Sequence, residues 1–182
     1  MRIIIFFLMF IRISFMFADT IITDTFSPGD EISVNINFEI SGDKIFLHLE
    51  FINISENDIA FNDGNFQTGV FFNFRDENNN RGNFHSALMR VEFDHIYLLN
   101  AIVKLEPGES KIYAYEIPYT YENNIFTADE IFDRIQFTNP ENINIVISYS
   151  TSAEEAARIH ETLGDITIMP NFRKSCLLFD FK

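Results

Sequence analysis

Residues 31–40 read EISVNINFEI and residues 44–54 read KIFLHLEFINI, and these two runs decide the fold class. In the first run apolar and polar residues alternate strictly, and in the second every other residue from Ile45 to Phe51 is apolar. The apolar members are Ile32, Val34, Ile36, Phe38 and Ile40 in the first run and Ile45, Leu47, Leu49 and Phe51 in the second. A period of two is typical of strands with one buried face. Residues 41–43, Ser-Gly-Asp, have the composition of a turn, so the two runs predict an antiparallel hairpin.

Strand patterns continue along most of the chain. Further strands are expected over 59–61, 70–74, 87–98, 101–105, 111–117, 143–149, 166–169 and 176–181. Turn residues separate them at 62–65, in the hydrophilic stretch 76–83, and at 106–109, where Pro-Gly favours a type II turn. Eight to ten short strands with this spacing predict a two-sheet sandwich.

Two short helices are expected to interrupt the strands, and each begins with a capping box. The boxes are Thr127 with Glu130, and Ser152 with Glu155. The first helix would end near Arg134 after one or two turns. The second covers 153–163 and ends at Gly164, a residue that commonly terminates helices.

The first eighteen residues have the layout of a secretory signal peptide. Arg2 is followed by apolar residues up to the small residue Ala18, after which the chain becomes polar. An uncleaved membrane anchor is the alternative, but Arg12 interrupts the apolar run and a spanning helix needs about 20 continuous apolar residues. We therefore expect residues 1–18 to be removed and the mature protein to be secreted or periplasmic.

The mature chain, 19–182, has the length of one domain and contains no linker-like stretch. Loss of two arginines with the signal peptide changes the formal charge from 13 − 27 = −14 to 11 − 27 = −16. Such an acidic surface disfavours binding to nucleic acid and to anionic lipid, so neither is an expected partner. Cys176 is the single cysteine, which excludes an intramolecular disulfide. It is either a small buried hydrophobe or one half of an intermolecular bridge.

Two segments resemble a known group of domains. LEFINISENDIAF (49–61) and KLEPGESKIYAYEI (104–117) are similar to bacterial exported immunoglobulin-like domains, and proteinase-inhibitor-like sandwiches share a similar turn. The matching positions are Asn53, Ser55, Ile59, Leu105, Pro107, Gly108, Glu109 and Ser110. The resemblance implies a mostly β, immunoglobulin-like antiparallel sandwich with one or two short peripheral helices. It implies no activity, because many functions share this fold.

Metal-binding patterns are weak in this chain. The histidines, at positions 48, 85, 95 and 160, do not have the short spacing of zinc sites. Asp76, Asn78 and Asn80 match the first three ligands of an EF-hand loop. However, Arg81 takes the place of the required glycine and Ala87 that of the final glutamate. A solvated hairpin loop is therefore expected, with no metal and no cofactor.

Catalytic patterns are also missing. Ser86 and Ser110 lie in no nucleophile motif, and the carboxylates are scattered along the sequence. Only the folded protein could bring two of them together, as glycoside hydrolysis requires. We therefore expect no catalytic residue and no enzymatic activity, while an enzyme with a carboxylate site remains the third hypothesis.

A cluster of tyrosines could serve binding, because tyrosine combines an apolar ring with a polar tip. Tyr113 and Tyr115 have the spacing of one strand face, which favours the core over an interface. Tyr119 and Tyr121 follow on either side of position 120 and are candidate binding residues together with the loop 76–83.

The sequence thus predicts an exported, non-enzymatic module that binds a protein or a surface polymer. The candidate contact residues are Tyr119, Tyr121, Asp76, Asn78 and Asn80. The sharpest version is a proteinase-inhibitor-like role using an end loop such as 76–83 or 62–69. The alternative is a structural subunit of a periplasmic or envelope assembly that pairs through an edge strand such as 176–181.

Overall fold

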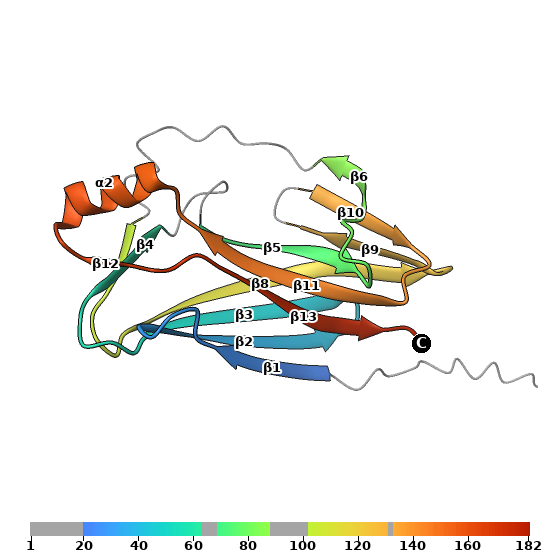
Figure 1. Ribbon diagram of the computed structural model, residues 1–182. Coiled ribbons are helices and arrows are strands. Elements are labelled where there is room, and N and C mark those ends of the chain that lie inside the picture. Colours follow the sequence, from blue (N-terminus) through green and yellow to red (C-terminus); the bar gives the residue numbers. More distant parts are fainter. Residues whose placement is uncertain (1–19, 63–68, 88–101, 131–132) are drawn as a thin grey trace, which may run out of the picture.

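Two main β-layers, a small third sheet and one peripheral helix make up the described part of the protein (Figure 1). The computed structural model describes residues 20–62, 69–87, 102–130 and 133–182. The first layer has the strand order β1-β2-β3-β8-β9-β10-β6, and the second has the order β13-β11-β5. A third, small sheet with the order β12-β4-β7 lies at the end of the molecule near α2. All pairs are antiparallel except β12 with β4, which is parallel.

The elements have the following bounds. The first layer contains β1 (Thr20–Phe26), β2 (Ile32–Ser41), β3 (Lys44–Asn53), β8 (Ser110–Glu122), β9 (Ile125–Asp129), β10 (Asp133–Thr138) and β6 (Asn83–Ala87). The second contains β5 (Gly69–Asp76), β11 (Asn142–Ser150) and β13 (Phe172–Asp180). The remaining elements are β4 (Ile59–Asn62), β7 (Ile102–Leu105), α2 (Ala153–Leu163) and β12 (Thr167–Ile168).

The hairpin predicted from 31–54 is confirmed, including its register. β2 and β3 pair from Ile32 opposite Asn53 to Ser41 opposite Lys44, and Gly42 adopts a left-handed φ of 61° in the turn. All nine predicted inward side chains are buried. The alternating pattern succeeds here because a slip of one residue would turn every apolar side chain toward water.

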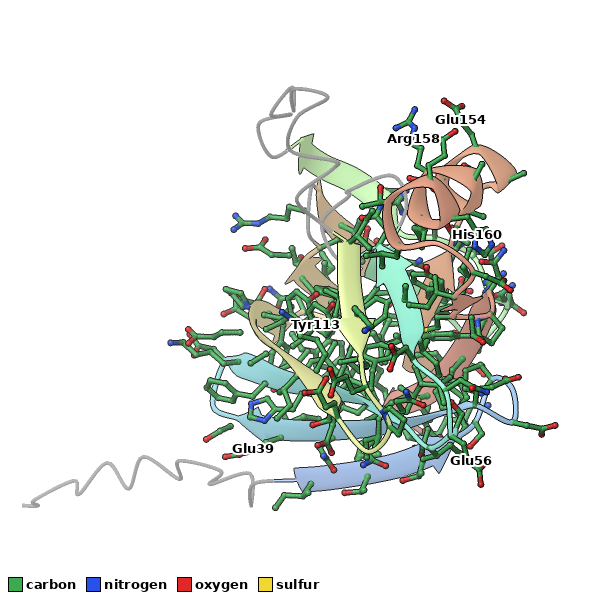
Figure 2. The ribbon with its side chains drawn as sticks, turned by 90° about the vertical axis from the view of Figure 1, so that its left-hand side faces the viewer. Glu39, Glu56, Tyr113, Glu154, Arg158 and His160 are labelled. Atoms are coloured by element: carbon green, nitrogen blue, oxygen red, sulfur yellow. The ribbon has the colours of Figure 1, made fainter. Side chains whose placement is uncertain are left out.

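Isoleucine, leucine, valine and aromatic side chains fill the space between the two layers (Figure 2). Phe72 of β5 meets Tyr115 of β8 edge-on at 5.3 Å, and Phe74 lies 5.8 Å from Phe126 of β9. Tyr113 packs edge-on against Phe51 at 5.6 Å. Tyr113 and Tyr115 therefore contribute to the core, as their spacing favoured. The fold is mostly β with sandwich packing, and its immunoglobulin-like topology stays a prediction.

β8 is longer than predicted because it serves two partners in succession. It pairs with β3 up to Pro118, which lies opposite Lys44 at the end of β3, and with β9 from Tyr119 onward. Proline lacks a backbone N–H, so it is tolerated at such a change of partner. The strand therefore continues through Pro118 to Glu122.

The helix predicted from Thr127 toward Arg134 is wrong. Thr127 lies in the middle of β9, and its backbone pairs with β8 on one side and β10 on the other. Glu130, expected to close the capping box, instead accepts a hydrogen bond from the Phe74 N–H at 2.8 Å. A capping box is a local signal, and pairing on both sides of the strand overrides it.

Three further predictions concern segments near the gaps in the description. β6 ends at Ala87, where the predicted strand 87–98 begins, and the rest of that strand lies outside the described residues. The predicted turn 62–65 lies outside them after Asn62. The last strand, β13, begins at Phe172, four residues earlier than predicted.

α2 has the predicted bounds and caps. The Glu155 N–H donates to Ser152 Oγ at 3.2 Å, and the Ser152 N–H donates to Glu155 Oε2 at 3.0 Å. Of its side chains only Ile159 is buried, so α2 lies over one end of the sandwich, and its labelled polar residues point outward (Figure 2). Gly164 follows with φ 82° and ψ −151°, a conformation almost restricted to glycine.

We expect Ser152→Ala to lower the free energy of unfolding by about 1 kcal/mol, because the first-turn N–H loses its side-chain acceptor. Gly164→Val should cost about 1–3 kcal/mol, because a β-branched residue resists that backbone conformation. Chemical denaturation of both variants measures these losses. A Gly164→Val variant as stable as the wild type would contradict the assigned helix end.

Cys176 is buried on β13 and behaves as a small core residue. Burial, followed by the nearby Asp24 carboxylate, raises the pKa of the Cys176 thiol to about 11. The thiol is therefore protonated at neutral pH and is a weak nucleophile. This arrangement favours the buried-hydrophobe alternative over an intermolecular bridge.

The rate of alkylation measures how accessible and how nucleophilic the Cys176 thiol is. We expect Cys176 in the folded protein to react with iodoacetamide at least tenfold more slowly than in denatured protein at pH 8. The rate in the folded state should still be rising at pH 10, because the thiolate population grows until the pKa is passed. Equal rates in folded and denatured protein would show that Cys176 is accessible.

Candidate functional site

Most of the predicted binding residues lie at one end of the sandwich, beside the C-terminus (Figure 1). We call this surface the loop end, and it consists of residues 76–83, 121–125, 139–141 and 180–182. The Glu141 N–H donates to Glu77 Oε2 at 3.1 Å, and the Phe181 N–H donates to the Glu141 carbonyl at 2.9 Å. Phe181 stacks on Tyr121 with ring centroids 4.2 Å apart. These contacts join the loop 76–83 to Tyr121.

Asp76 holds the loop in shape. Its Oδ1 accepts hydrogen bonds from the backbone N–H of Asn78 at 3.0 Å and of Asn80 at 2.7 Å. Its Oδ2 accepts a third bond from the Asn80 side-chain amide at 3.0 Å. Such bonds mimic a backbone turn and fix the loop locally. The Asp76 carboxylate therefore faces amide donors of its own loop, while the Asn78 amide is exposed and bonds to Glu77.

The base of the loop is anchored to the core. Arg81 forms an ion pair with Glu130 at 2.5 Å, and only 3% of the Glu130 side chain is exposed. Glu130 also accepts the Phe74 N–H, so this carboxylate is both paired and hydrogen-bonded. A buried charge needs such partners. The loop is thus tied to β5 and to the residue after β9.

The two candidate tyrosines have different environments. Tyr119 is partly buried between Phe126 and Phe179, and its hydroxyl donates to the Gly42 carbonyl at 3.1 Å. Burial raises the pKa of Tyr119, with a smaller contribution from Asp43. Tyr121 is 39% exposed and presents one ring face to Phe181. Tyr121 is therefore the tyrosine that a partner can reach.

Left-handed asparagines shape the turns of the loop end. They are Asn79, Asn123, Asn124 and Asn139, with φ between 51° and 61°. Asn123 and Asn124 form the two-residue connection between β8 and β9, a position where left-handed residues match the strand twist. This Asn-Asn pair is the sequence signal that could have predicted the β8–β9 hairpin. A shallow cleft of about 210 Å³ runs between loop 76–83 and the β10–β11 turn.

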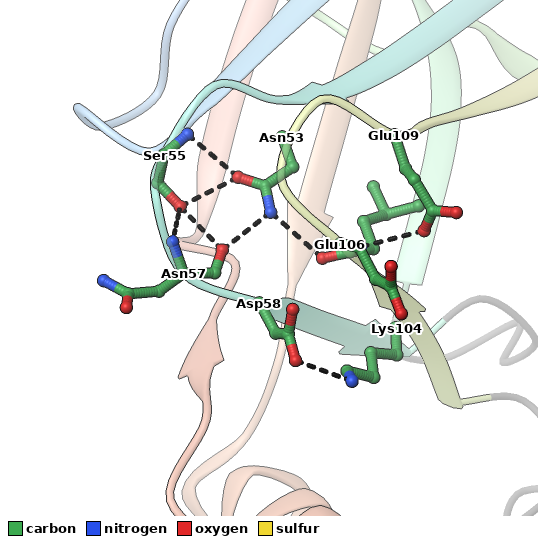
Figure 3. Close-up of polar contacts among 8 residues, drawn as sticks. Asn53, Ser55, Asn57, Asp58, Lys104, Glu106 and Glu109 are labelled. Atoms are coloured by element: carbon green, nitrogen blue, oxygen red, sulfur yellow. Dashed lines mark hydrogen bonds and ion pairs between the residues drawn. The ribbon is translucent and has the colours of Figure 1, made fainter.

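The opposite end holds a second cleft, of about 500 Å³. It is lined by Asn57, Asp58, Lys104, Leu163, Asp165, Ile166 and Thr167. Lys104 pairs with Asp58 at 2.6 Å (Figure 3), and this hydrogen bond raises the pKa of Lys104. The Lys104 ammonium group therefore forms an ion pair with Asp58. The carboxylates that line the cleft are Asp58, which is paired with Lys104, and Asp165.

The residues that carry the sequence resemblance meet beside this second cleft (Figure 3). The Asn53 side-chain amide donates to the carbonyls of Leu105 at 3.0 Å and Asn57 at 2.8 Å. Its oxygen accepts bonds from the Ser55 N–H at 2.9 Å and hydroxyl at 2.8 Å. Asn53 is fully buried, so these residues join the β3–β4 bend to the end of β7 and have a structural role.

Among the described residues, no three or more His, Cys, Asp or Glu side chains are grouped so that they could hold a metal ion. In that same part of the chain, no helix has the length and apolar character needed to cross a membrane. Comparison of the chain with protein-family models, curated proteins and solved structures finds no match.

Proposed function

We propose that the protein is an exported, non-enzymatic binding module that recognises a protein or a surface polymer through the loop end. The observation that carries this proposal is the proximity of a fixed loop, 76–83, to the exposed Tyr121. Binding residues are commonly placed on loops that a rigid scaffold positions.

The shape of the loop supports this proposal. Three hydrogen bonds to Asp76 and the anchor from Arg81 to Glu130 order the loop without a partner. A loop that is already ordered loses little conformational entropy on binding. A proteinase-inhibitor-like role is the sharpest version of the proposal, because it requires a loop held in one conformation.

The surface chemistry of the loop end also fits a binding role. Asn78 and Asn124 carry exposed amides, which donate and accept hydrogen bonds. Tyr121 and Phe181 add a stacked aromatic surface. This combination suits protein or carbohydrate surfaces, and the signal-like segment 1–18 suggests that the partner lies outside the cytoplasm.

Binding to the envelope fraction of the source cells, and inhibition of a panel of proteinases, test this function. Tyr121→Ala should weaken binding at least tenfold, because exposed tyrosines often supply a large share of interface energy. Asp76→Ala should weaken binding similarly by releasing the loop. Ile112→Ala is the control, since Ile112 is 61% exposed on the outer face of β8, away from the loop end.

The two loop-end variants should keep the thermal stability of the wild type to within a few degrees. Binding that is equally strong in the wild type, Tyr121→Ala and Asp76→Ala would contradict the loop end as the contact surface.

A further inference from the structure

β1 is an open edge of the seven-stranded sheet. It pairs with β2 through seven consecutive residues, from Thr20 opposite Ile40 to Phe26 opposite Val34, without a bulge. No other described strand pairs with β1. The side of β1 away from β2 therefore presents backbone N–H and C=O groups that can receive another strand.

The other open edges carry features that hinder pairing. β7 and β12 have only four and two residues, and β5 donates its Phe74 N–H to the buried Glu130 side chain. β13 contains Lys174 and has a register irregularity opposite Ile143 and Asn144, while β6 has five residues and an irregularity opposite Arg134 and Ile135. Lysines, bulges and short length are the usual protections of edge strands. β1 reads TIITDTF, with no lysine and no proline. The edge expected from the sequence to pair, 176–181, is thus better protected than β1.

The charge on β1 is also neutralised. Asp24 is its single ionisable side chain, and it forms an ion pair with Lys174 of β13 at 2.7 Å. The chain as a whole has a formal charge of −14, so two copies repel each other over most of their surfaces. The β1 edge is a place where that repulsion is locally weak.

We propose that β1 pairs antiparallel with β1 of a second copy, so that two seven-stranded sheets become one continuous sheet. A two-fold axis at Thr23 places Ile21 of each copy opposite Thr25 of the other. Ile21, Thr23 and Thr25 lie on the outer face of the sheet. They pair with Glu39, Asn37 and Asn35, the polar positions of β2. Pairs of β-branched side chains stabilise adjacent strands, and a two-fold interface requires such a self-complementary surface.

This inference does not depend on the proposed function. If both hold, the antiparallel arrangement places the two loop ends at opposite ends of the dimer. One dimer could then engage two sites of a polymer or of a repeating surface.

The oligomeric state of the purified protein tests the proposal. Light scattering over a concentration series should show the mass rising from that of one chain to that of two. Ile21→Lys should keep the protein monomeric at the same concentrations, because lysine at an edge opposes strand addition. Its melting temperature should be unchanged, since Ile21 is 71% exposed and the new ammonium would lie opposite Glu39.

Ile112→Lys is a matched control. Ile112 is exposed on the same face and lies opposite Glu50, but it belongs to the interior strand β8. This variant should dimerise like the wild type. A wild type that stays monomeric up to millimolar concentration would overturn the proposal, and so would an Ile112→Lys variant that is as monomeric as Ile21→Lys.

Cross-linking tests the register separately. A two-fold axis at Thr23 brings the two Thr23→Cys side chains together, so mild oxidation should give a disulfide-linked dimer. The native Cys176 is buried and should not interfere. Ile112→Cys should not cross-link under the same conditions. A Thr23→Cys protein that has the mass of a dimer but does not cross-link would overturn this register and show that another register or another surface forms the contact.

Discussion

Replacing Asn53 with alanine is expected to lower the free energy of unfolding by about 3–5 kcal/mol. The side chain is fully buried and makes four hydrogen bonds, with Leu105, Asn57 and Ser55. Alanine would leave the buried Leu105 carbonyl without its donor and would remove the bonds to the part-buried Asn57 carbonyl and Ser55 N–H. An unsatisfied buried group costs about 1–3 kcal/mol. Urea denaturation at neutral pH measures the loss.

Asn53→Asp separates the loss of the amide donor from the loss of volume. An aspartate has nearly the same shape, but its carboxylate would face the carbonyl oxygens of Leu105 and Asn57. The folded state then disfavours the charged form, so the pKa of this aspartate is raised above its unfolded value. The loss of stability should be largest at pH values well above the raised pKa. It should become smaller as the pH falls through that pKa, because the protonated acid can donate one hydrogen bond to a carbonyl oxygen.

Asn57→Ala is the matched control for Asn53. Asn57 lies in the same bend, but its side chain is exposed and only its backbone takes part in the network (Figure 3). We expect a loss within about 0.5 kcal/mol. Similar losses for Asn53→Ala and Asn57→Ala would contradict the structural role assigned to Asn53.

Replacing Phe51 with alanine should cost about 3–5 kcal/mol, because a buried ring is lost and a cavity remains. Phe51 is fully buried on β3 and lies within 5.6–6.1 Å of the rings of Tyr113, Phe172 and Phe61. These neighbours come from β8, β13 and β4, so Phe51 packs against both layers and the small sheet. Thermal and urea denaturation both measure the loss.

Glu50→Ala is the control at the adjacent position. Glu50 points to the outer face of the sheet, where it accepts a hydrogen bond from Asn35 at 3.0 Å. We expect this change to cost no more than about 1 kcal/mol. Equal losses for Phe51→Ala and Glu50→Ala would show that the register of β3 is wrong by one residue.

Features that depend on neighbours in sequence could be predicted well. The β2–β3 hairpin follows from the strict alternation of β2 and the apolar residues at every other position of β3, and α2 follows from Ser152, Glu155 and Gly164 at its two ends. The loop 76–83 follows from its composition. In each case the groups that stabilise the structure lie within a few residues of one another.

The failed helix shows the limit of such signals. Thr127 and Glu130 have the spacing of a capping box, but Glu130 finds its partners in Arg81 and Phe74 instead. These residues are 49 and 56 positions away along the chain. No local pattern indicates that β8 and β10 will pair with the two sides of β9.

The residues of the candidate site could be predicted in part, but their arrangement in space could not. Asp76, Asn78 and Asn80 could be selected from the sequence because they form one loop, and Tyr121 because of its residue type. Their proximity could not be predicted, since it depends on Glu141 and Phe181, which reach the loop end only when β11 and β13 are in place.

The distinction has a physical cause. Alternation and capping reflect hydrogen bonds and burial over a few residues, so the sequence alone establishes a mostly β chain with its central hairpin and one capped helix. Pairing between distant strands depends on the packing free energy of the whole core. Only the folded chain therefore reveals Asn53 as a buried link between β3 and β7, Tyr121 as the exposed tyrosine of the loop end, and β1 as an open edge of the seven-stranded sheet.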